Sequence, residues 1–514
     1  MRKLNIGLTA LLAIAAIGPA RAVHLDPGGQ GQVLLFPYYT AHGHQQTLLS
    51  IFNSSDAAQV MQVTFREALN GRSVLQFKVW LGAADVWTGT VFALADDGRP
   101  GDGAAVLTRD RSCTTPLFSS SGLSTTGGTP YMLLGNASYS GTLSDGGPDD
   151  VGRARHGWVE VIALANVTGP LAASINFTSN GVPASCASVQ VVPFGPNVAT
   201  RPSGGLIGAA GVIRGEVGTL LASRAEALNG FTEISLFNDL TQPTPDLSAV
   251  NDGNPGAAAS AMAMDDRGRR HALTYGAPGS GSRPIDAVSA VLMATRVKGE
   301  FQTASSIGGT TDWVVTSPTK PFYTDPAIVG ATNPALAPFE ELFAAPGNSK
   351  TCAPYRAYNQ EQKVTTPLSA DCVFVPIGPF PSPPSFPSQF VTLFQAANVI
   401  PYYVGSNIYS FNQSQALAAP GPPRAQQPFL PWQVLPYVGS AGWTDMNLAT
   451  TQRNHRLPAS AEGKVLLGLP AIGFAASNII NSAVSNGVLA NYAYAVRHVT
   501  SVSCRKVSDD SPCD

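Results

Sequence analysis

The sequence predicts a mainly β protein, with an N-terminal immunoglobulin-like β-sandwich followed by a second β-rich domain that carries one or two short helices. Composition is the first observation: charged residues make up only 12% of the chain while hydrophobic residues make up 44%. The chain also has 51 glycines and 41 prolines, so it is rich in turns and poor in charged helix faces. The second observation is a series of β-rich runs between Gln32 and Leu94, spaced roughly ten residues apart with no helical pattern between them.

The run from Gln59 to Glu67 alternates strictly between two sets of side chains. A period of two residues is typical of a strand with two distinct faces. The turn residues Asn53 and Asn70-Gly71 lie between neighbouring runs, where turn chemistry expects them. The two sets are Val60, Gln62 and Thr64 on one face, and Met61, Val63 and Phe65 on the other.

The N-terminus has the pattern of a secretory signal peptide over residues 1–22. A basic pair, Arg2-Lys3, precedes an apolar run over residues 4–17, and a small-residue cleavage site ends at Ala22. An uncleaved membrane anchor is the alternative, but the run is short for a bilayer and a good cleavage site follows it. No later stretch reaches about 18 uninterrupted apolar residues, so we expect no transmembrane segment after signal cleavage.

The six cysteines form an even set after a signal peptide, which predicts disulfides. Six cysteines allow 15 pairings, of which nearest-neighbour pairing is the simplest. A metal site would need close pairs such as C-x-x-C, and the sequence contains none. The predicted pairs are Cys113–Cys186, Cys352–Cys372 and Cys504–Cys513.

Two domains are expected after the signal peptide, because the chain is too long for one ordinary core. We place the N-terminal β-sandwich at residues 23–202 and the C-terminal β-rich domain at residues 203–514. Proline-rich insertions are expected at 376–388 and 419–431, since proline is excluded from central strands.

Other elements follow from local pattern. Apolar residues at helical spacing predict one notable helix over Ile285–Phe301. The Gly-rich segment 96–150 reads as a long loop with one strand at 131–134. Segment 204–231 is expected to form two strands, or one strand and a helical turn. Further strands are expected at 157–168, 172–179, 188–194, 310–323, 389–404, 440–449, 464–481 and 487–500.

His42 and His44 are the only close histidine pair and are the candidate metal ligands. On an extended chain their side chains would lie on one face and could share a metal ion. No third ligand is nearby in the sequence, so a polar turn is the alternative reading. No metal and no other cofactor are predicted.

Catalytic motifs are not found. Gly279-Ser280-Gly281-Ser282 resembles a nucleophile elbow only in its letters, because no strand precedes it. Paired carboxylates of a hydrolase are recognised in space rather than in sequence, so no catalytic residue is assigned. The acidic candidates are Glu67, Glu160, Glu226, Glu340 and Glu341.

Two properties bear on partners. A formal net charge of −2 provides no basic surface for nucleic acid. Aromatic side chains could instead line a sugar-binding face, although core packing is the commoner fate of such residues in sandwiches. The aromatic candidates are Tyr38, Tyr39, Trp80, Trp87, Trp158, Trp313, Tyr402, Tyr403, Trp432 and Trp443.

Several segments in a fixed order carry a resemblance: GQVLLFPYYT, TLLSIFNSS, DVWTGTVF, TDWVVTSPTKPFY, GWTDMNL and GLPAIGFAASNIIN. Together they resemble a family of uncharacterised secreted proteins of Gram-negative bacteria, over nearly the whole mature chain. The resemblance implies export and a bacterial source. It implies no activity and no site residues.

The sequence therefore favours an exported, non-enzymatic protein of the periplasm, outer cell surface or extracellular space, with a binding or structural role. Its partner would be a protein or a carbohydrate at the cell surface. One alternative is a secreted hydrolase or carbohydrate-active enzyme whose acidic residues meet only in the fold. Another is a subunit of a surface assembly that joins its neighbours by strand addition.

Overall fold

The computed structural model describes most of the chain, and the descriptions below concern only that part. The predicted signal sequence up to residue 21, the insertion at 376–388, and Cys372 lie outside it. So do Tyr403 and Trp432. The described residues are 22–191, 198–237, 244–251, 257–362, 364, 390–402, 414–421, 423, 440–449, 455–481 and 490–514.

The protein is mainly β, and the paired strands within each sheet are antiparallel, which confirms the predicted class. The N-terminal half contains two sheets that face each other across a common core. The central sheet has the order β1 (His24–Leu25), β14 (Glu226–Asn229), β2 (Val33–Thr40), β10 (His156–Val167), β4 (Ala58–Glu67), β5 (Ser73–Leu81) and β8 (Cys113–Thr115), with β11 (Ala199–Thr200) paired to β10. The outer sheet has the order β13 (Thr219–Arg224), β12 (Leu206–Arg214), β3 (Gln45–Asn53), β6 (Val86–Ala93), β7 (Ala104–Leu107) and β9 (Tyr131–Leu133).

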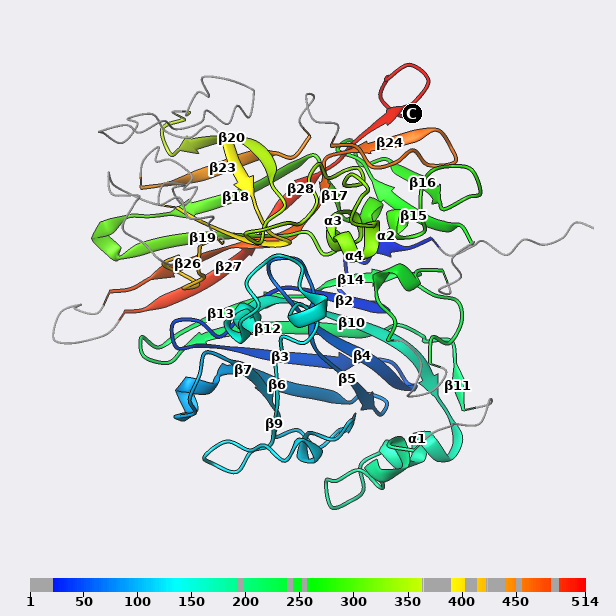
Figure 1. The fold of residues 1–514 in the computed structure, drawn as a ribbon, viewed down its shortest axis with the longest axis vertical. Helices are drawn as coiled ribbons and strands as arrows, with labels where there is room; N and C mark the ends of the chain where they lie inside the picture. The colour runs from blue at the N-terminus through cyan, green and yellow to red at the C-terminus, as the bar shows by residue number, and fades with distance from the viewer. Residues whose placement is uncertain are drawn as a thin grey trace, which may run out of the picture.

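The second half adds two larger sheets, three small strand pairs and most of the helices, and Figure 1 shows it stacked above the N-terminal half. One sheet has the order β21 (Phe390–Leu393), β20 (Thr351–Asn359), β23 (Ala441–Asn447), β18 (Arg296–Gln302) and β28 (Val499–Ser501). The other has the order β22 (Ala397–Pro401), β19 (Gly309–Thr316), β26 (Ile472–Ile479) and β27 (Tyr492–Arg497). The small pairs are β15 (Ala259–Met264) with β16 (Arg270–Tyr275), β17 (Met293–Ala294) with β25 (Leu469–Pro470), and β24 (Lys464–Leu467) with β29 (Ser503–Lys506). The helices are α1 (Gly169–Ile175), α2 (Ile285–Leu292), α3 (Pro321–Thr324) and α4 (Pro326–Val329).

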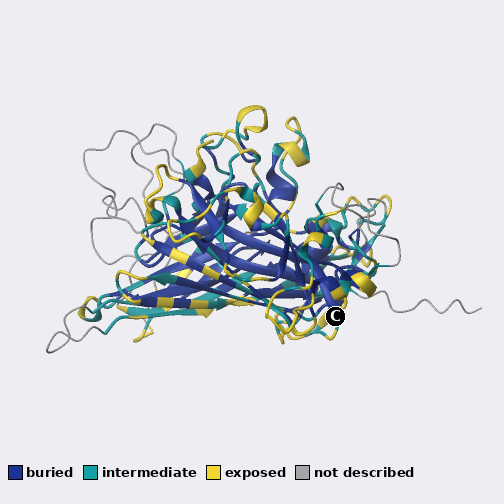
Figure 2. Ribbon diagram, turned by 90° about the horizontal axis from the view of Figure 1, so that it is seen from below, coloured by how far each residue is buried: buried dark blue, intermediate teal, exposed yellow. Residues whose placement is uncertain are grey.

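The central sheet is buried on both of its faces. Met61, Val63 and Phe65 of β4 pack toward the outer sheet, as the alternating pattern allows. The opposite face of β4 is covered by the second half of the chain, so Gln62 and Thr64 are each only 1% exposed. Figure 2 shows the result, with buried ribbon running through the interior and exposed residues mainly on loops.

The strands that follow residue 202 continue the two N-terminal sheets. β12 pairs with β3 along its whole length, from Leu206 opposite Asn53 to Arg214 opposite Gln45. β14 then pairs with β2 in the central sheet. The hydrogen-bonded N-terminal unit thus extends to Asn229, past the boundary expected between residues 202 and 203.

Local pattern misassigned two segments. The helix predicted over Ile285–Phe301 ends at Leu292, because the residues after it pair with β25, β23 and β28, and this long-range pairing outweighs helical propensity. A strand was also predicted at 172–179, but residues 172–175 belong to α1 instead. A proline in the first turn of α1 is followed there by good helix formers.

The remaining expectations have mixed outcomes. The segment 96–150 contains β7 and β8 in addition to the expected strand β9. Residues 186–189 form a 3₁₀ turn rather than the start of a strand, and residues 192–197 lie outside the described part. The immunoglobulin-like connection of the strands stays a prediction.

Two of the predicted disulfides are confirmed. Cys113 is bonded to Cys186, and Cys504 is bonded to Cys513. Cys352 is also disulfide-bonded. The first bond ties β8 to the segment after α1, so it closes a loop that contains β9, β10 and α1.

The two bonds should differ in their contribution to the free energy of unfolding. They span 73 and 9 residues, and loop-closure entropy makes the longer one more stabilising by about 2 kcal/mol. We expect Cys113→Ser/Cys186→Ser to lose that much more than Cys504→Ser/Cys513→Ser in denaturant unfolding. Equal losses, or a larger loss from the short loop, would contradict the entropic account.

Candidate binding groove

An open groove lies on the solvent-facing side of the outer sheet. β3 alternates, so Leu49 and Ile51 point into the core while Gln46, Leu48 and Ser50 point outward. This follows from the period of two residues in a strand.

The register of the neighbouring strands completes the floor of the groove. Leu48 lies opposite Thr90 and Ser50 lies opposite Thr88 on β6. Thr90 in turn lies opposite Leu107 on β7. The floor therefore combines aliphatic side chains with a row of hydroxyl groups.

Two loops raise the wall of the groove. Residues 94–97 form a 3₁₀ turn after β6, and the segment around Thr125–Thr129 folds toward it. The backbone N–H of Thr126 donates to the Asp97 carboxylate at 3.0 Å and joins the two loops. Beneath them, Phe92 and Tyr131 pack edge to face, so the wall rests on an apolar cluster.

The groove has a volume of about 620 Å³, which is within the range of small ligand sites. Asp96, Asp97 and Arg109 all belong to its lining. The Arg109 Nε donates to Thr129 Oγ1 at 3.2 Å, and among the described residues its guanidinium has no carboxylate partner. This arrangement can hold a polar or partly apolar partner through hydrogen bonds and through the positive charge of the Arg109 guanidinium.

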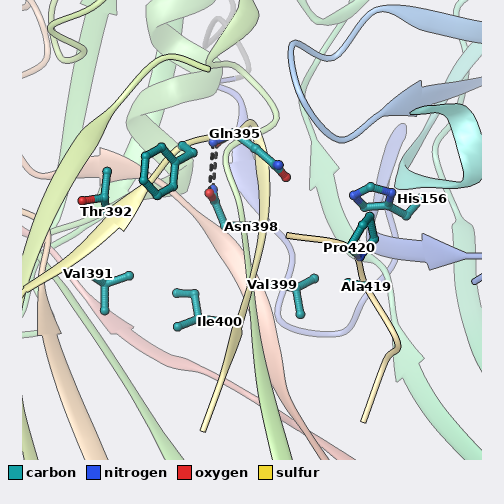
Figure 3. Close-up of a pocket in the computed structure, with 10 residues that line it drawn as sticks. His156, Val391, Thr392, Gln395, Asn398, Val399, Ile400, Ala419 and Pro420 are labelled. Atoms are coloured by element: carbon teal, nitrogen blue, oxygen red, sulfur yellow. Dashed lines mark hydrogen bonds between the residues drawn. The ribbon is translucent and has the colours of Figure 1, made fainter. Parts of the chain in front are cut away.

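A second hollow, shown in Figure 3, is much smaller. It lies between β22 and the segment at Ala419–Pro420, beside His156. Its volume is about 30 Å³, room for a water molecule or two. Asn398 closes one side, because its Nδ2 donates to the Gln395 carbonyl at 2.8 Å. The hollow is a packing void at the junction of the two halves.

The structure separates the two candidate metal ligands. Gly43 and His44 both have positive φ angles, of 57° and 56°, so the chain turns sharply instead of running extended. His42 Nε2 lies 3.2 Å from His156 Nδ1, whereas His44 Nδ1 contacts Asp96 Oδ1 at 2.8 Å. Within the described ranges, no group of three histidine, cysteine, aspartate or glutamate residues could hold a metal ion.

The carboxylates that a hydrolase would need are engaged at separate places in the fold. Glu160 pairs with Arg66 at 2.9 Å inside the central sheet, and Glu226 pairs with Arg497. Glu340 contacts His455 at 3.3 Å. The Glu341 carboxylate accepts a hydrogen bond from the backbone N–H of Lys350 at 3.2 Å.

Most of the aromatic candidates for a sugar-binding face lie in the cores instead. Trp443 is the exception, with 41% of its surface exposed, and its ring stacks on Tyr358 at 4.3 Å. Sheets bury large aromatic side chains between their layers, which removes them from any sugar-binding face. The buried residues are Tyr38, Tyr39, Trp80, Trp87, Trp158, Trp313 and Tyr402.

A buried ionic cluster, which the sequence did not reveal, lies in the N-terminal half beside a contact with the second half. Arg153 donates to Glu67 at 2.9 Å and to Asp145 at 2.7 Å, and all three side chains are 1% exposed or less. Next to it, Arg72 pairs with Asp325 at 2.7 Å, which links the β4–β5 turn to α4. Glu67 lies 86 residues from Arg153 and Asp325 lies 253 residues from Arg72, so no local pattern marks these two pairs.

No protein-family model, curated protein or solved structure matches this chain. The resemblance to secreted Gram-negative proteins therefore stays a prediction. None of the helices in the described part of the chain has the length and apolar character needed to cross a bilayer.

Removing Arg153, the cation of the buried cluster, should lower the free energy of unfolding substantially. Arg153→Met leaves Glu67 and Asp145 buried without a counter-charge, which typically costs about 3–5 kcal/mol. Arg111→Met is the matched control, because Arg111 is exposed and should change the free energy of unfolding by less than about 0.5 kcal/mol. Denaturant unfolding measures both, and a loss below about 1 kcal/mol for Arg153→Met would contradict the assignment.

The contact between the partly buried His42 and the buried His156 should make stability fall at acid pH. Burial and then the charge of Arg155 lower the pKa of His156 to about 4, and burial and then the charges of His156 and Arg155 lower that of His42 to about 2. In the unfolded chain both titrate near their ordinary pKa of 6.5. Between about pH 6.5 and 4 the unfolded state binds more protons, so folding loses stability as the pH falls.

His156→Asn should reduce this pH dependence. We expect the loss of unfolding free energy between about pH 7 and pH 5 to be smaller by about 2 kcal/mol than in the wild type. Denaturant unfolding of both proteins at the two pH values measures the difference. An unchanged pH dependence would show that His156 is already protonated in the folded protein.

Proposed function

We propose that this is an exported, non-enzymatic protein of the periplasm or outer cell surface that binds a protein partner in the groove on its outer sheet. The observation that carries the proposal is the open groove of about 620 Å³, floored by Leu48, Thr88 and Thr90 and bordered by Arg109. Pockets of this size that combine apolar side chains with a few polar groups are a usual form of binding site.

The chemistry of the lining residues favours binding a partner over catalysing a reaction. The groove offers hydroxyl groups, Asp96, Asp97 and a guanidinium, with no histidine beside a nucleophile among its lining residues. Asp96 and Asp97 accept hydrogen bonds from His44 and from Thr126. Hydrolytic chemistry would need an activated nucleophile or a pair of free carboxylates.

A protein partner fits better than a carbohydrate. Sugar recognition commonly uses an exposed aromatic platform, and the one aromatic ring of the groove, Phe92, is only 4% exposed and packs on Tyr131. Aliphatic and hydroxyl side chains on a sheet face suit an extended polypeptide segment, with Arg109 and Asp97 providing polar contacts at the border.

Export is supported by the signal-peptide pattern and by the disulfides. Cys113–Cys186 and Cys504–Cys513 are both formed, and such bonds persist in oxidising compartments.

The test combines fractionation with cross-linking from the groove. A photo-reactive amino acid replaces Thr90 on the groove floor, or Asn180 on an exposed turn near α1 as the control. In the native host we expect the protein in the envelope fraction, and a discrete cross-linked protein from position 90 that Leu48→Asp abolishes. Recovery in the cytoplasm would contradict export, and equal cross-linking from both positions would contradict the groove.

A further inference from the structure

A pair of stacked aromatic rings lies on the sheet formed by β21, β20, β23, β18 and β28. Trp443 of β23 lies opposite Tyr358 of β20, and their ring centroids are 4.3 Å apart with 11° between the planes. Trp443 is 41% exposed, whereas the four other tryptophans that the structure describes have no exposed surface. Figure 1 shows β20, β23 and β18 on the side of the second half that lies away from the N-terminal sheets.

Strand register surrounds the two rings with charged side chains. On β18, Glu300 lies opposite Trp443, and Lys298 lies opposite Asp445. On the other side of β23, Arg356 of β20 also lies opposite Asp445. We call the surface that these side chains form the aromatic face. It consists of Arg296, Lys298, Glu300, Arg356, Tyr358, Trp443 and Asp445.

The other face of the same sheet is buried, which fixes the direction of the aromatic face. Phe301 of β18 stacks on Tyr402 with ring centroids 4.8 Å apart, and Met446 of β23 has no exposed surface. Because side chains alternate along a strand, the neighbouring residues Glu300 and Asp445 point to the opposite side. The aromatic face is therefore directed away from the core.

The carboxylate of Asp445 has an unused hydrogen-bond acceptor on this face. Asp445 is 8% exposed, and its Oδ2 lies 3.6 Å from Arg296 Nη2. Its Oδ1 accepts no hydrogen bond from any residue that the structure describes. A buried acceptor without a donor costs free energy, so a ligand hydroxyl group that reached it would form a charge-assisted hydrogen bond. Asp445 is two residues from Trp443, or about 7 Å along the strand, which is about the span of one sugar ring with its hydroxyl groups.

We propose that the aromatic face binds a neutral oligosaccharide made of pyranose rings. The C–H groups on one side of such a ring carry a partial positive charge and pack on the electron-rich face of an indole. The hydroxyl groups lie around the edge of the sugar ring, where Glu300 and Asp445 can accept hydrogen bonds and Lys298 can donate one. This site is distinct from the groove, because none of its residues lines the groove.

The charges of the sheet favour a neutral ligand over an anionic polymer. Its five strands contain three basic residues and two acidic ones, all on the aromatic face. Nucleic acid or an acidic glycan is attracted by a strongly positive surface, which this near balance does not provide. A neutral sugar uses charges of both signs, because each of its hydroxyl groups both donates and accepts hydrogen bonds.

Tyr358 holds the indole of Trp443 in place before a ligand arrives. It covers one face of the indole, so the exposed surface of Trp443 belongs to the other face and to the ring edges. A side chain that is already ordered loses less entropy on binding. A cross-strand aromatic pair also stabilises a sheet, so a loss of stability alone would not identify a binding site. The test therefore measures the ligand.

Oxidation by N-bromosuccinimide, located by peptide mass spectrometry, tests the site in the unmodified mature chain with its disulfides formed. Trp443 should react faster than the four buried tryptophans. The probes are cellotetraose, chitotetraose and maltotetraose, with glycerol as the control. We expect at least one tetrasaccharide at about 10 mM to slow the oxidation of Trp443 at least about fivefold, which corresponds to a dissociation constant of about 2 mM or tighter.

Variants locate the binding that calorimetry measures. We expect Trp443→Ala to raise the dissociation constant of the bound tetrasaccharide at least about tenfold, and Asp445→Asn to raise it about threefold. Phe177→Ala is the matched control and should change nothing, because Phe177 is an aromatic residue of similar exposure, 43%, that lies elsewhere. Circular dichroism shows whether each variant is folded, and Trp443→Thr replaces an unfolded Trp443→Ala because threonine favours strands.

Two results overturn the proposal. One is that no tetrasaccharide protects Trp443 or binds the chain, including the case in which Trp443 captures an envelope protein instead. The other is binding that the folded Trp443 variant leaves unchanged. Protection by only one tetrasaccharide supports the site and identifies the linkage or ring substituent that it recognises. Leu48→Asp separates this site from the groove, because it should abolish cross-linking from position 90 and leave sugar binding unchanged.

Discussion

The whole structure depends on a central antiparallel sheet that is covered on both faces. One face packs on the outer sheet, and the other packs on α2 and the sheets of the second half. Antiparallel sheets can leave one face in water, but here a core that contains residues of both halves covers the second face. Polar residues on the second face must then be paired internally: Gln62 Nε2 donates to the carbonyls of Val63 and Phe77, and Glu160 pairs with Arg66.

The buried ionic cluster has a positional role at this junction. Arg153 holds the turn at Glu67 and the loop at Asp145 together, while its guanidinium lies over the rings of Tyr139 and Phe343. Burial raises the pKa of Asp145, but the hydrogen bonds and charge of Arg153 outweigh it and the pKa is lowered. Desolvation offsets much of the attraction in such a cluster. The cluster meets the second half through the Phe343 ring and lies next to the Arg72–Asp325 pair. With the halves joined, the outer sheet presents the groove to solvent.

The candidate site was only partly predictable. The run that contains Leu48 and Ser50 was recognisable as a strand, and alternation alone places those two side chains on one face. The groove also needs the wall formed by the loops at 94–97 and 123–129, which meet only through tertiary contacts such as Thr126 to Asp97. In the same way, the side chains of His42 and His44 point apart because Gly43 and His44 adopt left-handed backbone conformations. The spacing of these residues in the sequence does not reveal that conformation.

The sequence by itself determined the β class and the position of most strands, because period-two patterns are local properties. It predicted the two confirmed cysteine pairs only as part of the simplest of 15 pairings. Only the tertiary structure decided what covers each face of the central sheet, where the helix after Ile285 ends, and how β12 to β14 return to the N-terminal sheets. Alternation tells which side chains share a face. What packs on that face is settled by strands hundreds of residues away, whose pairing outweighs local propensity.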